Sequence, residues 1–280
     1  MIRIGVQTSI SGGIHKAVER QKEKTGNCGQ VFSHSPQSWS EPSITNEESS
    51  KFQDLCSDND INPWVVHTSY LVNLCSPRDD LRRKSIDSVQ TDLEVADRLN
   101  MKYVNTHLGA HTGAGEEKGI QNAIESINQL NIPDGVELLI ETDSGSGTNL
   151  GSKFDQLQVL QEKTENKIGF CIDTAHIWAA GYDLTTEKSV DSVFQTVDKT
   201  IGIENVKLFH MNDSKHDMGT NRDEHQHLGE GEIGYEGISS VVDVAGRNNI
   251  PMIAETPITD EKGDPWNLNR VRSMWSESKD

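Results

Sequence analysis

A short run of β-branched and other apolar residues, followed by a stretch with helical periodicity, recurs along the whole chain. The runs predict eight strands, at residues 2–6, 30–32, 64–67, 103–107, 137–141, 168–173, 206–210 and 252–255. The periodic stretches predict helices near residues 13–24, 46–57, 78–99, 117–130, 152–163, 190–201, 235–248 and 267–276. Eight alternations in 280 residues are typical of an α/β protein with a (β/α)8 TIM barrel, and we expect residues 1–280 to form one domain. Periodicity alone does not separate this barrel from an open, doubly wound sheet.

Local signals refine the expected elements. Thr45 with Glu48 three residues later predicts a capping box, and Ser152 is expected to cap the helix near 152–163. The segment 211–234 has no apolar periodicity, and loops of this length in compact folds are usually functional or mobile.

The charge of the chain bears on its partners. The formal net charge is −18, which by itself counts against a nucleic-acid partner, since phosphates are usually bound by clustered Lys and Arg. Either the ligand is a small molecule or metal, or the acidity is a whole-surface adaptation to a salt-rich, halophilic cytoplasm. No apolar run approaches the roughly 18 residues of a membrane helix. We expect a cytoplasmic protein without membrane contact, and its four scattered cysteines should be free thiols.

Residues of metal-ligand type stand at the ends of six consecutive predicted strands. They are His67, His107, Glu141, Asp173, His210 and Glu255. Three further candidates follow: His176, Asp223 and His225. In a (β/α)8 barrel the carboxyl ends of the strands meet at one face, where active sites lie. We therefore expect all nine side chains to converge.

The joint pattern predicts more than one metal ion. A lone histidine after a strand is more often an ordinary hydrogen-bonded residue than a ligand. Converging carboxylates without matching Lys or Arg would repel one another and lose hydration, unless cations lie between them. Nine ligands exceed the four of one zinc ion, and mixed His and carboxylate ligation suits zinc or manganese hydrolytic chemistry. Other histidines fit this pattern less well: His111 and His227 could orient ligands, and we expect His15, His34 and His216 at the surface.

Seven motifs resemble the endonuclease IV family of apurinic/apyrimidinic endonucleases. They are HTSYLVNL from residue 67, THLGAH from 106, ETDSGSGTNLG from 141, CIDTAHIWAAGYDL from 171, FHMNDSK from 209, RDEHQHLGEGEIG from 222 and AETP from 254. The resemblance covers essentially the whole chain. It implies a zinc-dependent TIM barrel that repairs double-stranded DNA containing abasic sites.

The resemblance also implies the layout of three Zn²⁺ ions, with manganese as an alternative at one site. One ion would take His67, His107 and Glu141; a second would share Glu141 and take Asp173, His210 and Glu255; the third would take His176, Asp223 and His225. Among these, His107, Glu141 and Glu255 are expected to be catalytic. A hydroxide between the first two ions would attack the phosphate 5′ of the abasic site, leaving a 3′-hydroxyl and a 5′-deoxyribose phosphate. A monomer fits such an enzyme.

Loop residues implied to contact DNA complete the expectation. Tyr70 and Leu71 stand where family members insert a wedge into the duplex, and Gln37, in FSHSPQSW from residue 32, stands where Arg is expected. Further departures from the family pattern are Leu108 for Pro and Thr142-Asp143 for Asn-Thr, which could shift affinity or metal preference.

Two alternatives stay open. A sugar isomerase or epimerase would share the barrel and part of the metal ligands but would not need His176, Asp223 and His225. A silent metal-storage or DNA-binding module would require broken ligands, and none is broken.

Overall fold

Eight parallel strands form the centre of the molecule. The computed structural model describes residues 2–259 and 262–278. The sheet order is β1-β10-β7-β6-β5-β4-β3-β2, and all neighbouring strands run parallel. The strands are β1 (Ile4–Val6), β2 (Gly29–Phe32), β3 (Trp64–His67), β4 (Tyr103–Thr106), β5 (Glu137–Glu141), β6 (Ile168–Asp173), β7 (Val206–His210) and β10 (Met252–Ala254). A bridge between Gln7 and Gln30 links the two ends of the sheet, where β1 meets β2. The predicted TIM barrel is therefore confirmed.

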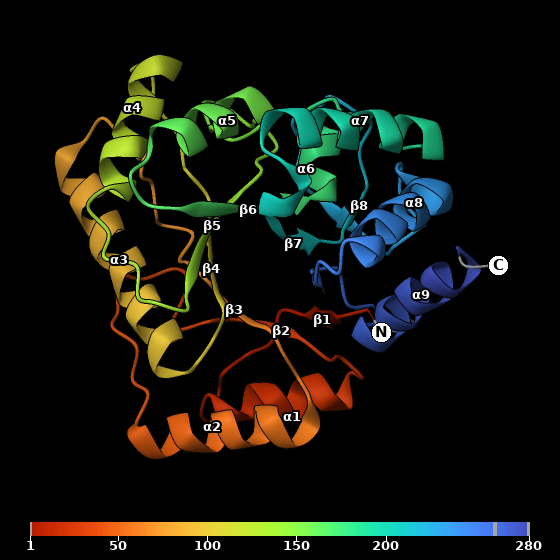
Figure 1. Ribbon diagram of the computed structural model, residues 1–280, viewed down its shortest axis with the longest axis horizontal. Coiled ribbons are helices and arrows are strands. Elements are labelled where there is room, and N and C mark those ends of the chain that lie inside the picture. Colours follow the sequence, from red (N-terminus) through yellow and green to blue (C-terminus); the bar gives the residue numbers. More distant parts are fainter. Residues whose placement is uncertain (1, 260–261, 279–280) are drawn as a thin grey trace.

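Helices surround these strands on the outside, as Figure 1 shows in a view along the barrel. They are α1 (His15–Glu23), α2 (Asn46–Asn59), α3 (Asp79–Arg98), α4 (Glu116–Ile127), α5 (Phe154–Lys163), α6 (Thr174–Ala179), α7 (Glu187–Thr200), α8 (Gly234–Arg247) and α9 (Asp264–Glu277), with a 3-10 turn, η1, at Ile203–Asn205. The predicted capping box is confirmed, because Thr45 and Glu48 exchange both hydrogen bonds at the start of α2. The predicted cap Ser152 is wrong, since Lys153 precedes α5 in extended conformation without a side-chain cap.

The alternation of side chains along the strands explains where the site lies. Successive strand residues point to opposite faces, so residues two apart share the barrel interior. One interior layer is apolar and consists of Cys28, Val65, Leu139, Cys171, Leu208 and Ile253. The interior layer above it, two residues later on each strand, is polar and consists of Gln30, His67, Glu141, Asp173, His210 and Glu255. The apolar layer closes the barrel beneath the polar one, so the polar layer opens only toward the carboxyl ends of the strands.

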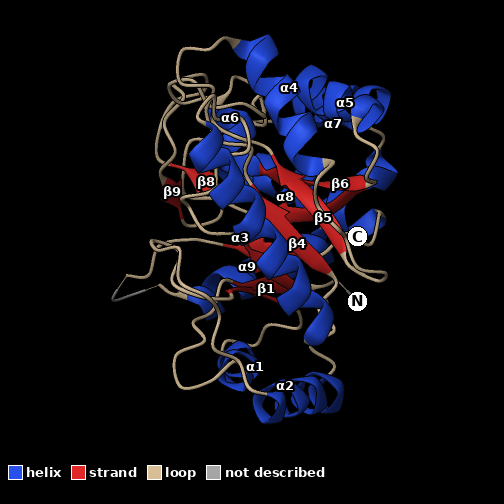
Figure 2. Ribbon diagram, turned by 90° about the vertical axis from the view of Figure 1, so that its left-hand side faces the viewer, coloured by secondary structure: helices blue, strands red, loops and turns tan. Residues whose placement is uncertain are grey.

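Three features differ from the sequence prediction. A short helix, α6, follows β6 directly, because the Asp173 carboxylate accepts the N–H groups of Ala175 and His176 and caps it. The segment 211–234 contains an antiparallel hairpin of β8 (Asp213–Ser214) and β9 (His225–Gln226). Figure 2 shows this hairpin among the loops at one end of the barrel. Helices α7 and α9 also begin three residues earlier than expected.

Two further expectations concern burial and membranes. All four cysteines are free and buried, as expected for packed thiols. Among the described residues, no helix has the length and apolar character needed to cross a bilayer.

Candidate metal centre

All nine predicted ligands come together at the carboxyl end of the barrel. Four of them end their strands: His67, Glu141, Asp173 and His210. His107 and Glu255 follow β4 and β10 by one residue, while His176 lies on α6, Asp223 in the loop before β9 and His225 in β9. A cavity of about 380 Å³ is lined by seven of the nine. Asp173 and His210, both fully buried, complete the group.

Glu141 is at the centre of this group. Its Oε2 lies 3.2 Å from Nε2 of His67 and 3.5 Å from Nε2 of His107. Its Oε1 lies 2.9 Å from Nδ1 of His210 and 3.4 Å from Nδ1 of His176. The two oxygens of one buried carboxylate therefore face different histidines, an arrangement suited to a carboxylate that is shared between two cations.

Two more groups of ligand atoms adjoin Glu141. The Nδ1 of His210 lies 3.2 Å from Oε2 of Glu255 and 3.8 Å from Oδ2 of Asp173. On the outer side, Asp223 places one oxygen 3.1 Å from Nε2 of His176 and the other 3.0 Å from Nε2 of His225. Within the described part of the chain, ligand atoms within 4.8 Å of one another form four sets: His67-His107-Glu141, Glu141-Cys171-His210, Asp173-His210-Glu255 and Asp173-His176-His225. The first and third lie within the sets that the family resemblance implies, and the fourth has Asp173 in place of Asp223.

Hydrogen bonds from outside the group orient four of the five histidines. One ring nitrogen of His67, His176 and His225 contacts the backbone oxygen of Thr68, Thr142 and Glu255, respectively, at 2.8–3.0 Å. In His210 the outward Nε2 contacts Oε1 of Gln30 at 2.9 Å. In each case the other nitrogen faces the carboxylates, and in His176 the bonded Nδ1 also lies 3.4 Å from Oε1 of Glu141. Histidine ligands of metals are held in this way, with one nitrogen on the ion and the other donating a hydrogen bond.

The electrostatics of the group also favour cations. Within residues 2–259 and 262–278, the ion pairs of Glu141, Asp173, Asp223 and Glu255 are all with histidines. Burial alone would raise the pKa of Glu141, yet the neighbouring imidazoles, chiefly His107 and His210, hold it well below its usual value. Burial opposes a charged imidazole at His225, but Asp223 and Asp173 raise its pKa to about 9. The carboxylates thus attract positive charge, and the donor set of imidazoles and carboxylates fits zinc or manganese.

Amide side chains support the carboxylates and were missed by the sequence analysis. Asn105 donates to Oε2 of Glu141 at 2.6 Å, and Asn212 donates to Oδ2 of Asp173 at 2.7 Å. Gln30 donates to Oε1 of Glu255 at 2.9 Å. A search for ligand types alone passes over amides, whereas the two-residue strand period, counted from the apolar layer, reaches Gln30 and Asn105.

The residues that depart from the family pattern have defined places. Thr142 accepts the Asp173 N–H on its hydroxyl. Asp143 is nearly buried, and its Oδ2 lies 3.7 Å from Nδ1 of His107. Leu108 is fully buried in the core.

The predicted DNA-contact residues lie on two adjacent loops at the rim. Tyr70 is 64% exposed and lines the cavity of the site, and its ring packs edge-on against Phe32 at 5.1 Å. Leu71 is half-buried, and Gln37 is exposed. The loops are tied together, since the backbone N–H of Tyr70 and the hydroxyl of Ser69 both donate to the carbonyl of Pro36.

The remaining histidines lie outside the ligand group. His34 was expected at the surface, and this is wrong: its side chain is 6% exposed because it packs beside Asp92 of α3. His216 is one-fifth exposed and pairs with Glu224. His111 accepts the N–H of Gly115. His227 is buried against Asn267.

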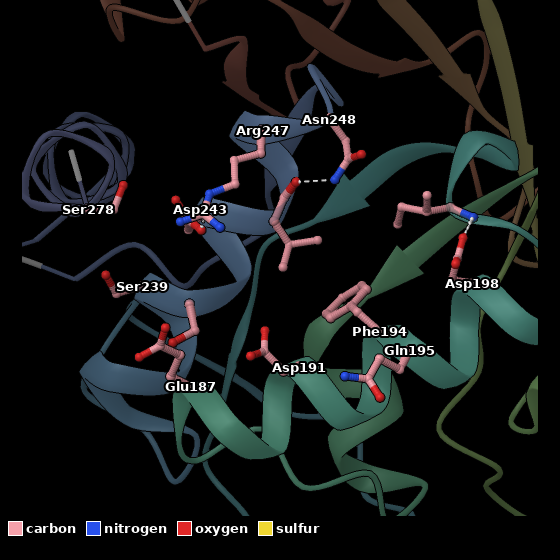
Figure 3. A pocket seen from close by; sticks show the side chains of 13 residues that line it. Glu187, Asp191, Phe194, Gln195, Asp198, Ser239, Asp243, Arg247, Asn248 and Ser278 are labelled. Carbon is pink, nitrogen blue, oxygen red and sulfur yellow. Dashed lines mark hydrogen bonds and ion pairs between the residues drawn. The ribbon is translucent and has the colours of Figure 1, made fainter.

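Another cavity, of about 610 Å³, lies away from this group on the helical exterior (Figure 3). It lies between α7 and α8 and is lined by acidic residues, including Glu187, Asp191 and Asp198. Asp243 there pairs with Arg247 at 2.7 Å. The cavity has no histidine among its described lining residues, so it lacks the mixed donor set of the barrel end.

Comparisons with known proteins agree with this geometry. Residues 26–274 match the family described as xylose isomerase-like TIM barrel. Proteins named probable endonuclease 4 from Haloarcula marismortui and Natronomonas pharaonis are 50% and 49% identical, and each alignment covers 99% of this chain and 100% of the relative. The crystal structure of endonuclease IV from Thermus thermophilus has a TM-score of 0.87 at 33% identity, covering 98% of this chain and 99% of that one. A D-tagatose 3-epimerase-like protein has a TM-score of 0.73 at 17% identity over the full length of both chains, which is a likeness of fold alone.

The fold and the family match define the class of the protein as a xylose isomerase-like TIM barrel. Within that class the chain belongs to the endonuclease IV family. The expectation of a hydrolase of this type is thereby confirmed, and the halophilic sources of the relatives named above fit the predicted adaptation to salt.

Proposed function

We propose that this protein is a DNA-repair endonuclease that hydrolyses the phosphodiester bond 5′ to an abasic site in double-stranded DNA. The products are a 3′-hydroxyl and a 5′-deoxyribose phosphate. We propose three zinc ions as cofactors, held by the nine ligands, and a monomer that acts in the cytoplasm.

One observation carries the proposal: the nine side chains of ligand type lie in one connected group with Glu141 at its centre. Outward hydrogen bonds leave four of the histidines with one nitrogen facing the carboxylates. The third set, built around Asp223, extends the group beyond what one or two ions require.

The residues of the chain prepare the site for a phosphate. Ions bound there would polarise the phosphate, lower the pKa of a water near Glu141 and stabilise the departing 3′-oxygen. His107 and Glu255 lie at the open side of the group and would face the substrate. Their side chains are 28% and 24% exposed, respectively. Asp173 and His210 are fully buried and would bind an ion from the inner side of the group. The positive charge of the ions would also offset the acidity of the chain locally.

A metal and activity measurement tests this function. The purified protein should contain more than one zinc ion per chain and should nick an abasic-site duplex on the 5′ side of the lesion. The absence of both, measured in the salt that best supports folding, would overturn the proposal.

The sugar isomerase or epimerase alternative predicts a different dependence on the third set. His225→Ala should reduce nicking strongly if the protein is a three-ion nuclease, because it removes a ligand from the set around Asp223. An isomerase would keep its activity in this variant. A matched control is His216→Ala. His216 lies in the hairpin that also contains His225, but it pairs with Glu224 and is not among the nine proposed ligands.

A further inference from the structure

The outward hydrogen bonds of the histidines differ in one respect. Those of His67, His176 and His225 are made with backbone oxygens, which no substitution removes. That of His210 is made with the side chain of Gln30. Among these four outward hydrogen bonds, that of His210 is therefore the one that a side-chain substitution removes.

Gln30 is fully buried and touches two of the proposed ligands at once. Its Oε1 lies 2.9 Å from Nε2 of His210, and its Nε2 lies 2.9 Å from Oε1 of Glu255. The carboxylate of Glu255 can only accept, so the amide nitrogen must face it and the amide oxygen must face His210. That oxygen can only accept, so Nε2 of His210 carries a hydrogen. Nδ1 is then the nitrogen available to an ion, and it is Nδ1 that faces Glu141, Glu255 and Asp173.

The backbone of Gln30 is fixed as well. Its carbonyl accepts the Thr8 N–H at 2.8 Å where β1 meets β2, and it is in register with Val65 of β3. It lies two residues after Cys28 of the apolar interior layer, just as His67 lies two residues after Val65 of that layer. Strand β2 thus contributes to the polar layer an amide that orients ligands.

We propose that Gln30 is a positioning residue that fixes the tautomer of His210 and the carboxylate of Glu255, and so sets the affinity for the ion bound by Asp173, His210 and Glu255. This inference rests on the proposed function, because it requires that the group binds metal. Loss of such an outer hydrogen bond typically lowers metal affinity by about 10–100-fold.

The experiment is a competition titration of zinc against a chelator on the metal-free full chain. Gln30→Met preserves the approximate shape of the side chain but removes both hydrogen bonds. It should lower the affinity for one of the bound zinc ions by about 10–100-fold. Gln30→Glu keeps an acceptor for His210 but replaces the donor to Glu255 with an oxygen, so it should also weaken that ion. Gln21→Met is the matched control, since Gln21 is equally buried but donates to the carbonyl of Cys28 at a distance from the ligands. It should bind zinc as the unmodified protein does.

A second readout separates positioning from a general loss of structure. In the zinc-loaded protein, long-range ¹H–¹⁵N spectra should show the Nε2 hydrogen of His210. Its signal should be kept in Gln30→Glu and should be shifted or broadened by exchange in Gln30→Met, where the hydrogen has no acceptor. Zinc in excess should restore nicking by Gln30→Met, since the change acts on affinity. Equal zinc affinity in Gln30→Met and the unmodified protein, or a hydrogen on Nδ1 of His210 in the zinc-loaded unmodified protein, would overturn the inference alone. Failure of the unmodified protein to bind zinc would overturn the proposed function and the inference with it.

Discussion

Asp92 offers a quantitative test of the packing beside the site. It lies on α3, is fully buried, and accepts the hydroxyl hydrogen of Ser33 at 2.5 Å on Oδ1, while its Oδ2 has no hydrogen-bond partner among the described residues. Burial raises the pKa of this carboxyl to about 7. Ser33 begins the loop that leads to Gln37, so Asp92 anchors a loop at the rim of the site.

The sign of the effect follows from linkage. The folded state holds a proton on Asp92 up to a pKa of about 7, whereas the unfolded state releases it near the ordinary value of 3.8. The stabilising contribution is therefore complete below about pH 4 and is lost as pH rises through 7. This difference of about three pKa units corresponds to about 4 kcal/mol in the free energy of unfolding, at about 1.36 kcal/mol per pKa unit. That is a large part of the 5–15 kcal/mol of a typical folded protein.

The measurement compares the unmodified, metal-free protein with Asp92→Asn by denaturant unfolding from pH 4 to 9. Asparagine keeps an acceptor for Ser33 and does not titrate. The imidazole of His34, whose pKa burial lowers, acts in the opposite direction and is present in both proteins. The free energy of unfolding of the unmodified protein should fall relative to the variant by up to about 4 kcal/mol between pH 4 and 8. If the difference in unfolding free energy between the two proteins stays constant from pH 4 to 9, the raised pKa of Asp92 is contradicted. Asp97→Asn, at an exposed position on the same helix, is the control.

Three further predictions follow from the site. Asp143→Ala should lower zinc affinity by about 10–100-fold at the ion that His107 is proposed to bind. The reason is that Asp143 is the carboxylate near Nδ1 of His107, which has no hydrogen-bond partner within the described residues. Chelator competition checks this, and Asp143→Asn should be less affected. Tyr70→Ala should leave the fold intact and weaken binding of an abasic duplex by about 5–150-fold, as expected for one lost stacking contact of about 1–3 kcal/mol, measured by fluorescence anisotropy. Binding to that duplex should weaken with salt at a log–log slope well below about ten, because we expect few basic residues, such as Lys16, Lys215 and Arg222, to face DNA. Lys16 and Lys215 are moreover paired with Glu19 and Glu224, and a slope near ten contradicts this prediction.

Much of the barrel and the convergence of the nine candidate side chains could be predicted from the sequence. The strand ends could be predicted because β-branched runs stop at polar residues. Residues at those ends lie on one face because the carboxyl ends of all barrel strands meet there. His67, Glu141 and Asp173 each end such a run and were predicted to lie at this face. The structure brings them together as expected.

Other features depended on contacts between distant residues. The burial of His34 arises from Asp92, which lies on a helix beyond the next strand, so local hydrophobicity gave no sign of it. Helix α6 is capped by Asp173, and a six-residue helix has too little periodicity to be recognised. The hairpin in segment 211–234 is held by the buried carboxylate of Asp213, which accepts the N–H groups of Ser214, Gly229, Gly231 and Ile233. Gln30 was overlooked because an amide is not a usual ligand, although it lies two residues after Cys28 on the same strand.

The acidity of the chain no longer argues against DNA. Acidic residues are exposed on helices such as α2, where Glu47 and Asp54 face solvent, while the four carboxylates of the site are paired with histidines. The net charge of −18 counts exposed and buried carboxylates together, whereas the proposed ions determine the charge that a phosphate meets at the site.

The central claim is that the group around Glu141 binds metal ions that cleave DNA at abasic sites. The most direct test is to remove all metal, restore zinc in steps, and follow nicking of an end-labelled abasic duplex together with bound zinc per chain. The account predicts that nicking 5′ to the lesion, with a 3′-hydroxyl product, begins only when more than one zinc ion is bound. Cleavage by the metal-free protein, or no cleavage by the fully loaded protein at any salt concentration that preserves the fold, would contradict it.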